Sequence, residues 1–244
     1  MSTPKQFTFG RPNFETAGRW LGLAPELDGP VWMVNLMKYR AVADYGGGDG
    51  VDVAEGAAPI TGKQADDAYA PLGPLAAIGA VVAFHGDVTA QAAGDPAWDR
   101  IGIVRHASRA SFFAMQERDD FKKQYTHKKA GMEFTIVMGC LPTFADAGLD
   151  ESPADGASYV MRVRRFADGA TPGDDLAGVR PVATFEVDGV ILGDDRRWDE
   201  VRFDLADDAA IALMQETSGV DEQVIVRVDR GLDRLVHTVV TAKN

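Results

Sequence analysis

Two stretches of this sequence resemble each other, "PAWDRIGIVRHASRASFFAMQE" at 96–117 and "RRWDEVRFDLADDAAIALMQE" at 196–216. Each has Trp-Asp near its start, continues as an apolar segment typical of a β-strand, and ends on Met-Gln-Glu. Ser108 in one copy and Asp207 in the other can cap a helix by accepting a hydrogen bond from an early backbone N–H. The shared order of segments indicates that the chain contains two related halves.

Further apolar segments place the remaining strands around these two stretches. We expect strands at 31–40, 79–88, 98–106 and 133–141 in the first half, and at 158–166, 180–189, 198–205 and 234–242 in the second. Each half then has the ferredoxin-like order, a four-stranded antiparallel sheet with helices on one face. Because both faces of the first strand are apolar, its second face also needs cover. We predict an α+β fold: two ferredoxin-like repeats with antiparallel sheets packed into an intrachain pseudo-dimeric α+β barrel.

The same spacing predicts the division of the chain. We expect an N-terminal extension with a short docking helix at 1–29, a first repeat at 30–145, a linker at 146–157 and a second repeat at 158–244. The docking helix, at 13–27, would present Phe14, Trp20, Leu21 and Leu23.

The two repeats differ most between their first and second strands. The first has room for a Gly-rich loop at 45–62, interpreted as a flap over a pocket, and for a helix at 63–79 that Pro71 and Pro74 should kink or break. The second repeat has only 167–179 there, so it should lack most of its first helix. We therefore expect two unequal pockets, of which only one works.

Composition argues against several classes of partner. The net charge is −12 and no long basic run exists, so a nucleic-acid partner is not expected. Cys140 is the only cysteine, which excludes an intrachain disulfide, and the four histidines lack metal-ligand spacing, so we expect no metal site. No apolar run suits a signal peptide or membrane helix, which predicts a cytoplasmic protein without a membrane partner. Pairing of whole chains into a homodimer is left open.

The first half also resembles a known family, through "MVNLMKYR", "DAYAPLGPLAAIGAVVAFHGDV" and "GDPAWDRIGIVRHASRASFFAMQERDDFKKQYTHKKA". Residues 30–142 are similar to an uncharacterised, domain-of-unknown-function family of the dimeric α+β-barrel superfamily. The matching positions are Asn35, Tyr69, Trp98-Asp99, Ser108, Phe112, Met115 and His127. The sequence departs from the family pattern at "RHAS" and at Lys128, where arginine is usual. The resemblance implies the barrel fold and a range of small-molecule chemistries, including cofactor-free ones.

Four residues are candidates for catalysis. His85, with Asp87 two positions along the same strand, is a candidate general base, or alternatively a solvent-exposed histidine at a strand end. Asn35 interrupts an apolar strand, where an unpaired amide would cost about 1–3 kcal/mol, so it either binds a substrate carbonyl or satisfies the backbone at a bulge. His127 and Arg105 are candidates for proton transfer and for binding a carboxylate or enolate, with surface positions as the alternative.

Further residues are candidates for substrate binding. Tyr69, Trp32 and Trp98 could line an aromatic pocket, although such residues more often pack in the core. Trp198 repeats Trp98, which favours a structural role for both. Arg162 takes the place of Asn35 in the second repeat and would form an anion site or an ion pair.

Three functions are compatible with these residues. The favoured hypothesis is a cofactor-independent enzyme of isomerase, cyclase, dehydratase or monooxygenase type, which transfers a proton on a small apolar or aromatic metabolite. The second is a haem-binding protein or enzyme with His85, His127 or His237 as axial ligand. The third is a non-catalytic ligand-binding or structural protein.

Overall fold

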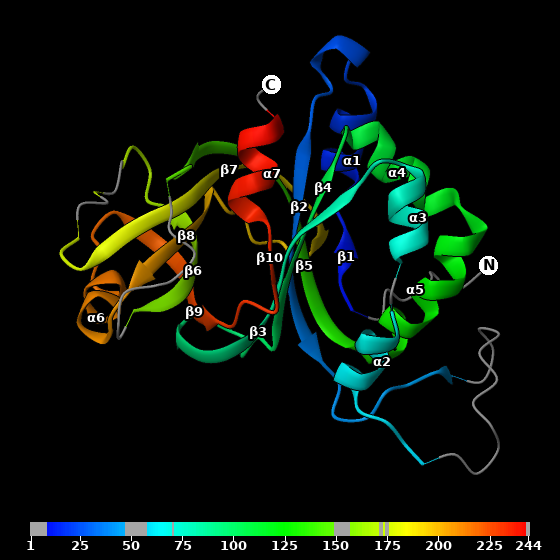
Figure 1. Cartoon of the computed structure of the whole chain (residues 1–244), viewed down its shortest axis with the longest axis horizontal. Helices are drawn as coiled ribbons and strands as arrows, with labels where there is room; N and C mark the ends of the chain where they lie inside the picture. Colours follow the sequence, from blue (N-terminus) through cyan, green and yellow to red (C-terminus); the bar gives the residue numbers. More distant parts are fainter. Residues whose placement is uncertain are drawn as a thin grey trace.

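The strands of this protein form a closed antiparallel barrel with helices outside it (Figure 1). The computed structural model describes residues 9–46, 58–69, 71–148, 157–170, 173 and 176–242. The barrel strands are β2 (Val31–Tyr39), β3 (Val81–Ala93), β4 (Arg100–His106), β5 (Met132–Ala145), β6 (Ser158–Phe166), β7 (Val179–Gly193), β8 (Glu200–Ala206) and β9 (Val220–Val228). Their order is β7-β5-β2-β4-β3-β9-β6-β8, and β8 pairs back with β7 to close the ring.

The ring consists of two runs with the same internal order. The first half contributes β5-β2-β4-β3 and the second contributes β9-β6-β8-β7, so each run has its fourth, first, third and second strand as neighbours. The runs join through the antiparallel pairs β3–β9 and β5–β7. Each half therefore completes the other's sheet at both edges, which leaves the ring without an open edge.

The repeated Trp-Asp has the same structural role in both halves. The Asp99 carboxylate accepts a hydrogen bond from the Tyr39 backbone N–H, and the Asp199 carboxylate accepts one from the Phe166 N–H, each at 2.7 Å. In both halves the aspartate N–H also donates to a carbonyl of the first strand. Trp98 and Trp198 are both buried in the barrel interior. In each half, the motif therefore anchors the start of the third strand to the end of the first strand.

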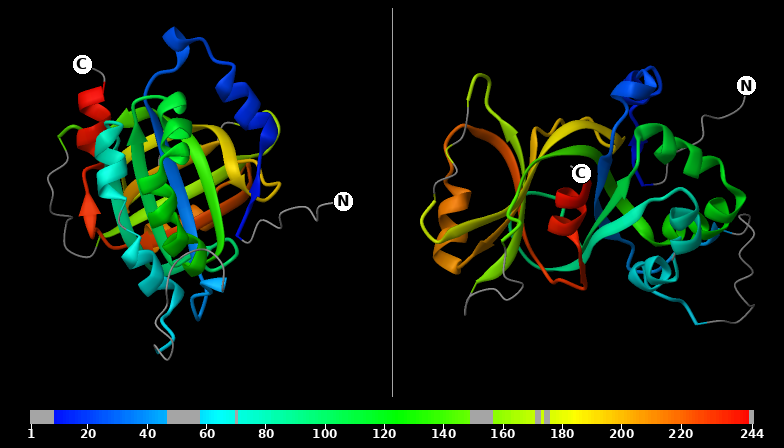
Figure 2. Two further views of the ribbon diagram at one scale, coloured as in Figure 1. Left: turned by 90° about the vertical axis from the view of Figure 1, so that its right-hand side faces the viewer. Right: turned by 45° about the horizontal axis from the view of Figure 1, so that its top comes forward.

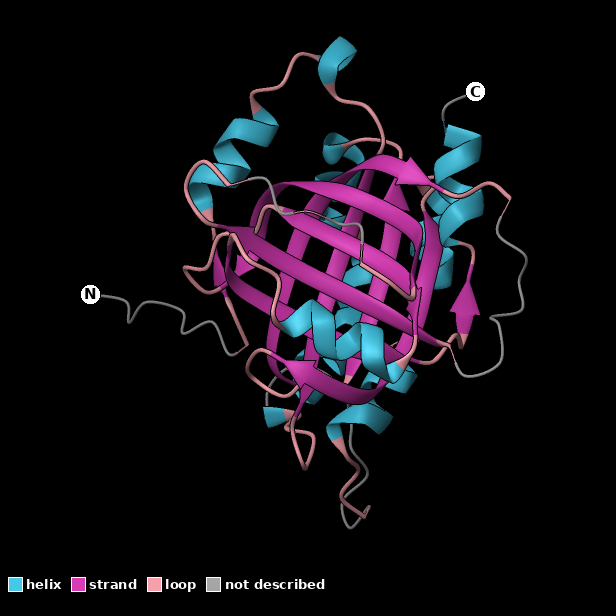
Figure 3. Ribbon diagram, turned by 90° about the vertical axis from the view of Figure 1, so that its left-hand side faces the viewer, coloured by secondary structure: helices cyan, strands magenta, loops and turns pink. Residues whose placement is uncertain are grey.

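The helices are distributed unequally around the barrel. Those of the first half are α2 (Gly62–Ala68), α3 (Leu72–Ala77), α4 (Arg109–Glu117) and α5 (Asp119–Gly131), and they stand in front of one face of the sheet in the left view of Figure 2. In the second half, α6 (Asp208–Gln215) lies across the strands (Figure 3). The predicted caps are confirmed, because Ser108 accepts from the Ser111 N–H and Asp207 from the Ala210 N–H.

Short elements complete the described chain. These are β1 (Arg11–Pro12), α1 (Phe14–Leu21), the 3₁₀ helix η1 (Pro25–Leu27), β10 (Leu232–Asp233) and α7 (Leu235–Ala242). Helix α1 is capped by Asn13 and packs against β7 and α4. Of its predicted docking residues, Trp20 is buried, whereas Phe14 and Leu21 are exposed. None of the described helices has the length and apolar character needed to cross a membrane.

The prediction of a strand at 234–242 is wrong. These residues form α7, and the fourth strand of the second half is β9. The stretch is apolar and rich in β-branched residues, which fits strand alternation, but Leu235 and Val239 are also four residues apart and so share one helix face. That face packs on the barrel core, and Thr238 accepts a hydrogen bond from Trp32 Nε1 at 3.1 Å. Tertiary packing therefore decides between the two structures.

The expected helix at 63–79 is interrupted, as its prolines predicted. Helix α2 ends at Ala68, and α3 begins after Pro71. Most of the predicted flap at 45–62, and most of the predicted linker at 146–157, lie outside the described residues.

Candidate functional site

A large cavity lies between the outer face of the first half's strands and the helices α2 to α5. Its volume is about 1120 Å³, which exceeds the ~300–1,000 Å³ typical of small-molecule sites. Its lining is mainly apolar and includes Met33, Met37, Leu75, Val82, Ile103, Val104, Phe112, Met115 and Phe121. The barrel interior, by contrast, is filled by a packed apolar cluster from both halves. The space for a ligand is therefore on the helix side of the sheet.

Strand alternation brings Asn35 to this cavity. Trp32, Val34 and Leu36 belong to the barrel core, so the intervening residues of β2 face the helices. Asn35 pairs with Gly102 on β4, and a Cβ at Gly102 would lie 3.1 Å from Met37 Cε. The Asn35 Nδ2 donates to the Met33 carbonyl at 3.1 Å. The backbone thus holds the side-chain nitrogen of Asn35, and the side-chain oxygen accepts a hydrogen bond from another part of the chain.

Lys128 of α5 is the partner of that oxygen. Its Nζ donates to Asn35 Oδ1 at 3.2 Å and lies 5.6 Å from the centroid of the Tyr69 ring. Burial lowers the pKa of Lys128, while the Asp66 carboxylate acts in the opposite direction. Lysine at this position is therefore a cavity residue, although the sequence drew attention to it only as a departure from the family pattern.

Two imidazoles also line the cavity, His85 of β3 and His106 of β4. Burial lowers the pKa of both, to about 4 for His106, and the Arg100 charge lowers that of His85 further. Both rings are therefore neutral near pH 7 and able to accept a proton. Within the described parts of the chain, His106 Nδ1 is buried without a hydrogen-bond partner, and its ring meets Phe112 edge-on at 5.4 Å.

An ion-pair network extends from Asp66, a lining residue of the cavity. The Tyr39 hydroxyl donates to Asp66 Oδ2 at 2.6 Å, and Arg100 Nη1 donates to the same oxygen at 3.0 Å. Arg100 Nε donates to Asp87 at 2.7 Å, and Lys63 pairs with Asp87 as well. Burial alone would raise the pKa of Asp87, but the hydrogen bonds from Arg100 and Lys63 lower it. Asp66 is a lining residue of the cavity, and its Oδ1 is buried without a partner among the described residues.

The residues predicted for the site are only partly brought together. Asn35, Tyr69 and His85 line the cavity. Asp87 is not a lining residue and is held by the network around Arg100. His127 lies beside the cavity on α5, where its Nδ1 is 3.0 Å from the Tyr45 hydroxyl.

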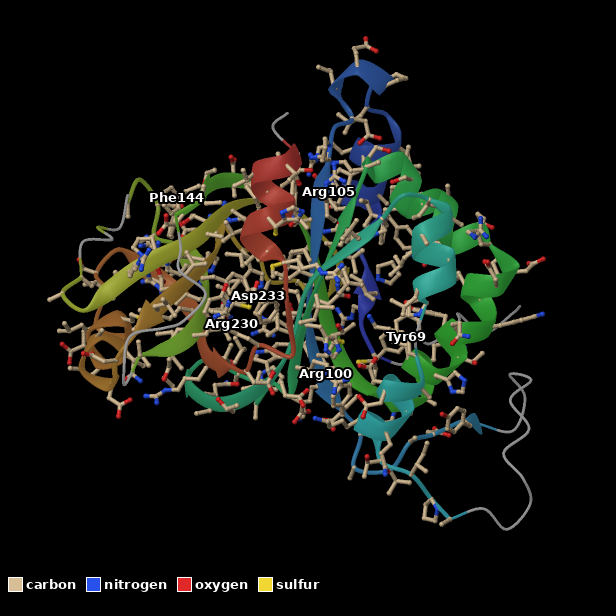
Figure 4. The ribbon with its side chains drawn as sticks, in the orientation of Figure 1. Tyr69, Arg100, Arg105, Phe144, Arg230 and Asp233 are labelled. Atoms are coloured by element: carbon tan, nitrogen blue, oxygen red, sulfur yellow. The ribbon has the colours of Figure 1, made fainter. Side chains whose placement is uncertain are left out.

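Other candidates lie elsewhere. Trp32 and Trp98 belong to the barrel core, and Arg105 stacks 5.9 Å from the Trp32 ring centroid. Figure 4 shows Arg105 well separated from Tyr69. Because Arg105 and His106 are adjacent on β4, they face opposite sides, and the cavity is on the His106 side. The sequence contained this alternation, but not which face the cavity would occupy.

Arg162 lies on the outer face of the second half, where charged side chains pack together. It pairs with Asp204 at 2.9 Å, and Arg202 pairs with the other oxygen of Asp204 at 2.7 Å. Arg162 and Asp204 are fully buried, and burial lowers the pKa of Arg162. Tyr159 and Met161 of β6 belong to the barrel core, so Arg162 faces outward, as Asn35 does on β2. In the second half, an ion pair therefore occupies the face that corresponds to the cavity face of the first half.

The chain is thus an α+β barrel protein with a ligand-sized cavity on its outer face. No model of a protein family matches the sequence, and no curated protein matches it. Two crystal structures of RPA0582 are similar to parts of this chain. The structure of the methylated protein aligns at 22% identity over 59% of this chain and 100% of that one, with a TM-score of 0.46. The other, described as a protein of unknown function from Rhodopseudomonas palustris, aligns at 24% identity over 53% of this chain and 92% of that one, with a TM-score of 0.42. A "putative monooxygenase" from Lactobacillus acidophilus NCFM aligns at 12% identity over 83% of this chain and 94% of that one, with a TM-score of 0.38.

Proposed function

We propose that this protein is a cofactor-independent enzyme that binds a small apolar or aromatic molecule in the cavity and transfers a proton on it. The observation that carries the proposal is a mainly apolar cavity of about 1120 Å³ into which neutral imidazoles project. A neutral base in a poorly solvated site is suited to general base catalysis near neutral pH. Isomerisation, cyclisation, dehydration and oxygenation each need such a step.

His85 is the base in this proposal. It is only half-buried and so can exchange its proton with solvent, whereas His106 is 1% exposed. Tyr69 supplies an aromatic wall, and its pKa is raised by burial, so its hydroxyl stays protonated. Arg105 and Arg162, which sequence reasoning offered as oxyanion ligands, have no part in it because neither lines the cavity.

We further propose that the chain arose by duplication of a ferredoxin-like unit. Two observations support this: the common strand order of the two halves, and the equivalent hydrogen bonds of Asp99 and Asp199. In this view the second copy lost its first helix and with it the cavity, and ion pairs such as Arg162–Asp204 now fill that face. One working pocket per chain follows.

Binding is tested with a neutral fluorescent probe, N-phenyl-1-naphthylamine. Val104→Phe would fill part of the cavity, and Val42→Phe is the matched control at a residue that is 56% exposed. We expect saturable binding at one site, weakened at least about tenfold by V104F, which corresponds to ~1.4 kcal/mol, and unchanged by V42F. Equal binding by all three proteins would contradict the proposed site.

Proton transfer is tested with 5-nitrobenzisoxazole, which opens when a base removes its C–H proton. We expect wild-type protein to accelerate this reaction and His85→Gln to lose about 10²-fold or more of the acceleration, with probe binding unchanged. If the probe binds but both proteins accelerate the reaction equally, His85 is not the base; if neither accelerates it, the protein is a non-catalytic binder.

Haem binding is the second candidate, favoured by the presence of His85 and His106 in one apolar cavity. Of the other axial ligands considered, His127 contacts Tyr45, and His237 is exposed on α7. Lys122 and Lys129 also line the cavity and could pair with propionates. Addition of haemin would then produce a shifted Soret band that His85→Ala and His106→Ala alter. A spectrum identical to that of free haemin would exclude this function.

A further inference from the structure

Lys128 differs from three other lysines, each of which forms an ion pair with a carboxylate. Lys38 pairs with Glu133, Lys63 with Asp87 and Lys122 with Glu117. Within the described ranges, no carboxylate lies within ion-pair distance of Lys128. Its amine instead meets an amide oxygen and an aromatic face, both at the lining of the cavity.

These contacts orient the amine. Asn35 Oδ1 accepts one N–H, and the Asn35 side chain is itself held by the Met33 carbonyl. The Tyr69 ring covers a second side. The cavity that Lys128 lines also holds two neutral imidazoles able to carry protons.

We infer that Lys128 is a nucleophile that forms an imine with aldehydes or ketones of apolar or aromatic character bound in the cavity. This inference rests on the proposed binding function and adds the substrate class. Nζ attacks the carbonyl carbon to form an N–C bond, and the carbonyl oxygen takes up a proton to give a carbinolamine. The C–O bond then breaks as the C=N bond forms, and the second amine proton leaves with the hydroxyl as water. No oxidant or reductant takes part.

Burial also favours the free amine that this step needs. Burial lowers the pKa of Lys128, which increases the fraction present as free amine. The facing groups are Asp66, whose charge opposes that shift, and the uncharged Asn35, Tyr69 and Tyr125. Imine formation at Lys128 should therefore begin at a lower pH than at an exposed lysine.

Asp66 narrows the substrate class further. Asp66 lines the cavity, and its Oδ1 is buried without a partner in the described chain, while Oδ2 already accepts from Tyr39 and Arg100. A buried acceptor left unpaired costs about 1–3 kcal/mol, and a ligand hydroxyl can remove that penalty. The carbonyl compound should therefore also carry a hydroxyl group, as a hydroxyaryl aldehyde does.

The test is reductive trapping with 4-hydroxybenzaldehyde and cyanoborohydride near pH 7, followed by peptide mass mapping. We expect one adduct per chain, at Lys128, equal to the aldehyde less one water plus two hydrogens. Lys128→Arg replaces the amine by a guanidinium of similar length, which forms no imine, and should abolish this adduct. Lys123→Arg, at an exposed position of the same helix outside the cavity lining, should leave it unchanged. Thermal unfolding of each variant checks that it is folded.

The outcomes separate the two proposals. If N-phenyl-1-naphthylamine binds and the aldehyde displaces it, but the adduct is absent or spread over surface lysines, imine formation is wrong and the binding proposal stands. If the naphthylamine does not bind, the binding proposal fails. Benzaldehyde, which lacks the hydroxyl group, tests the role of Asp66. We expect labelling to saturate at a benzaldehyde concentration several-fold higher than that needed with 4-hydroxybenzaldehyde. Saturation at the same concentration of both aldehydes would overturn the hydroxyl assignment.

Discussion

Replacing Asn35 by aspartate tests the central contact of the site. The change puts a carboxylate where the amide oxygen now lies, 3.2 Å from Lys128 Nζ. At that separation two unit charges attract by ~5 kcal/mol for an effective dielectric of 20, and by ~1.3 kcal/mol in bulk water. Because 1.36 kcal/mol corresponds to one pH unit, the pKa of Lys128 should rise by about 1 to 4 pH units.

The rise in pKa is measured by competitive acetylation. Acetic anhydride reacts only with the free amine, so the rate at Lys128, followed by peptide mass spectrometry across a pH series, gives the pKa of that residue. In the wild type the pKa should lie below 10.5, the ordinary lysine value, because of burial. N35D should move the profile to higher pH and slow both acetylation and imine trapping near pH 7 by at least about tenfold.

Two results would refute this reasoning. An unchanged profile in N35D would show that Nζ does not lie on Asn35 or that water screens it fully. A similar shift in Asn13→Asp would show that the effect comes from net charge, since Asn13 caps α1 and is not a lining residue. Both variants should retain wild-type circular dichroism.

Three further predictions concern stability. The pKa of His106 falls from an ordinary 6.5 to about 4 on folding, so the unfolded chain binds the extra proton and about 3 kcal/mol of stability should be lost as pH falls from ~6.5 to ~4. In His106→Gln this part of the loss should be absent, as shown by comparing urea unfolding of both proteins across that range. Asp204→Ala should reduce the free energy of unfolding by ~3–5 kcal/mol, because it leaves Arg162 buried without its carboxylate; a loss below ~1 kcal/mol would mean that water reaches this face. Thr238→Val removes the acceptor of Trp32 Nε1 and should lower the free energy of unfolding by ~1–2 kcal/mol, whereas no change would show that the hydrogen bond contributes nothing net.

Local rules predicted much of the barrel. Alternation located seven of its strands, and the helix caps Ser108 and Asp207 are where the sequence placed them. The duplicated Trp-Asp indicated a shared structural role, and Asp99 and Asp199 form matching hydrogen bonds. The strands and caps are predictable because each depends on residues close in sequence or on a period of two or 3.6 residues, whereas the partners of Asp99 and Asp199 lie 60 and 33 residues away.

The site was predictable only in part. Asn35 and His85 drew attention as polar interruptions of apolar strands, and both line the cavity. His106 and Lys128 were not selected, because nothing in their local sequence shows what lies across from them. His106 faces the cavity only because the helices cover that side of β4, and Lys128 meets Asn35 across a separation of 93 residues.

The sequence by itself determined the periodic elements, the caps and the resemblance of the two halves. The tertiary structure decided that 234–242 is a helix, that the cavity lies outside the barrel, and that Arg162 is neutralised by Asp204. The physical reason is that a short apolar run is compatible with either a helix or a strand, and the surface against which it packs selects one of them. Likewise, burial and the approach of distant charges set the protonation state of a side chain, and neither exists before the chain has folded.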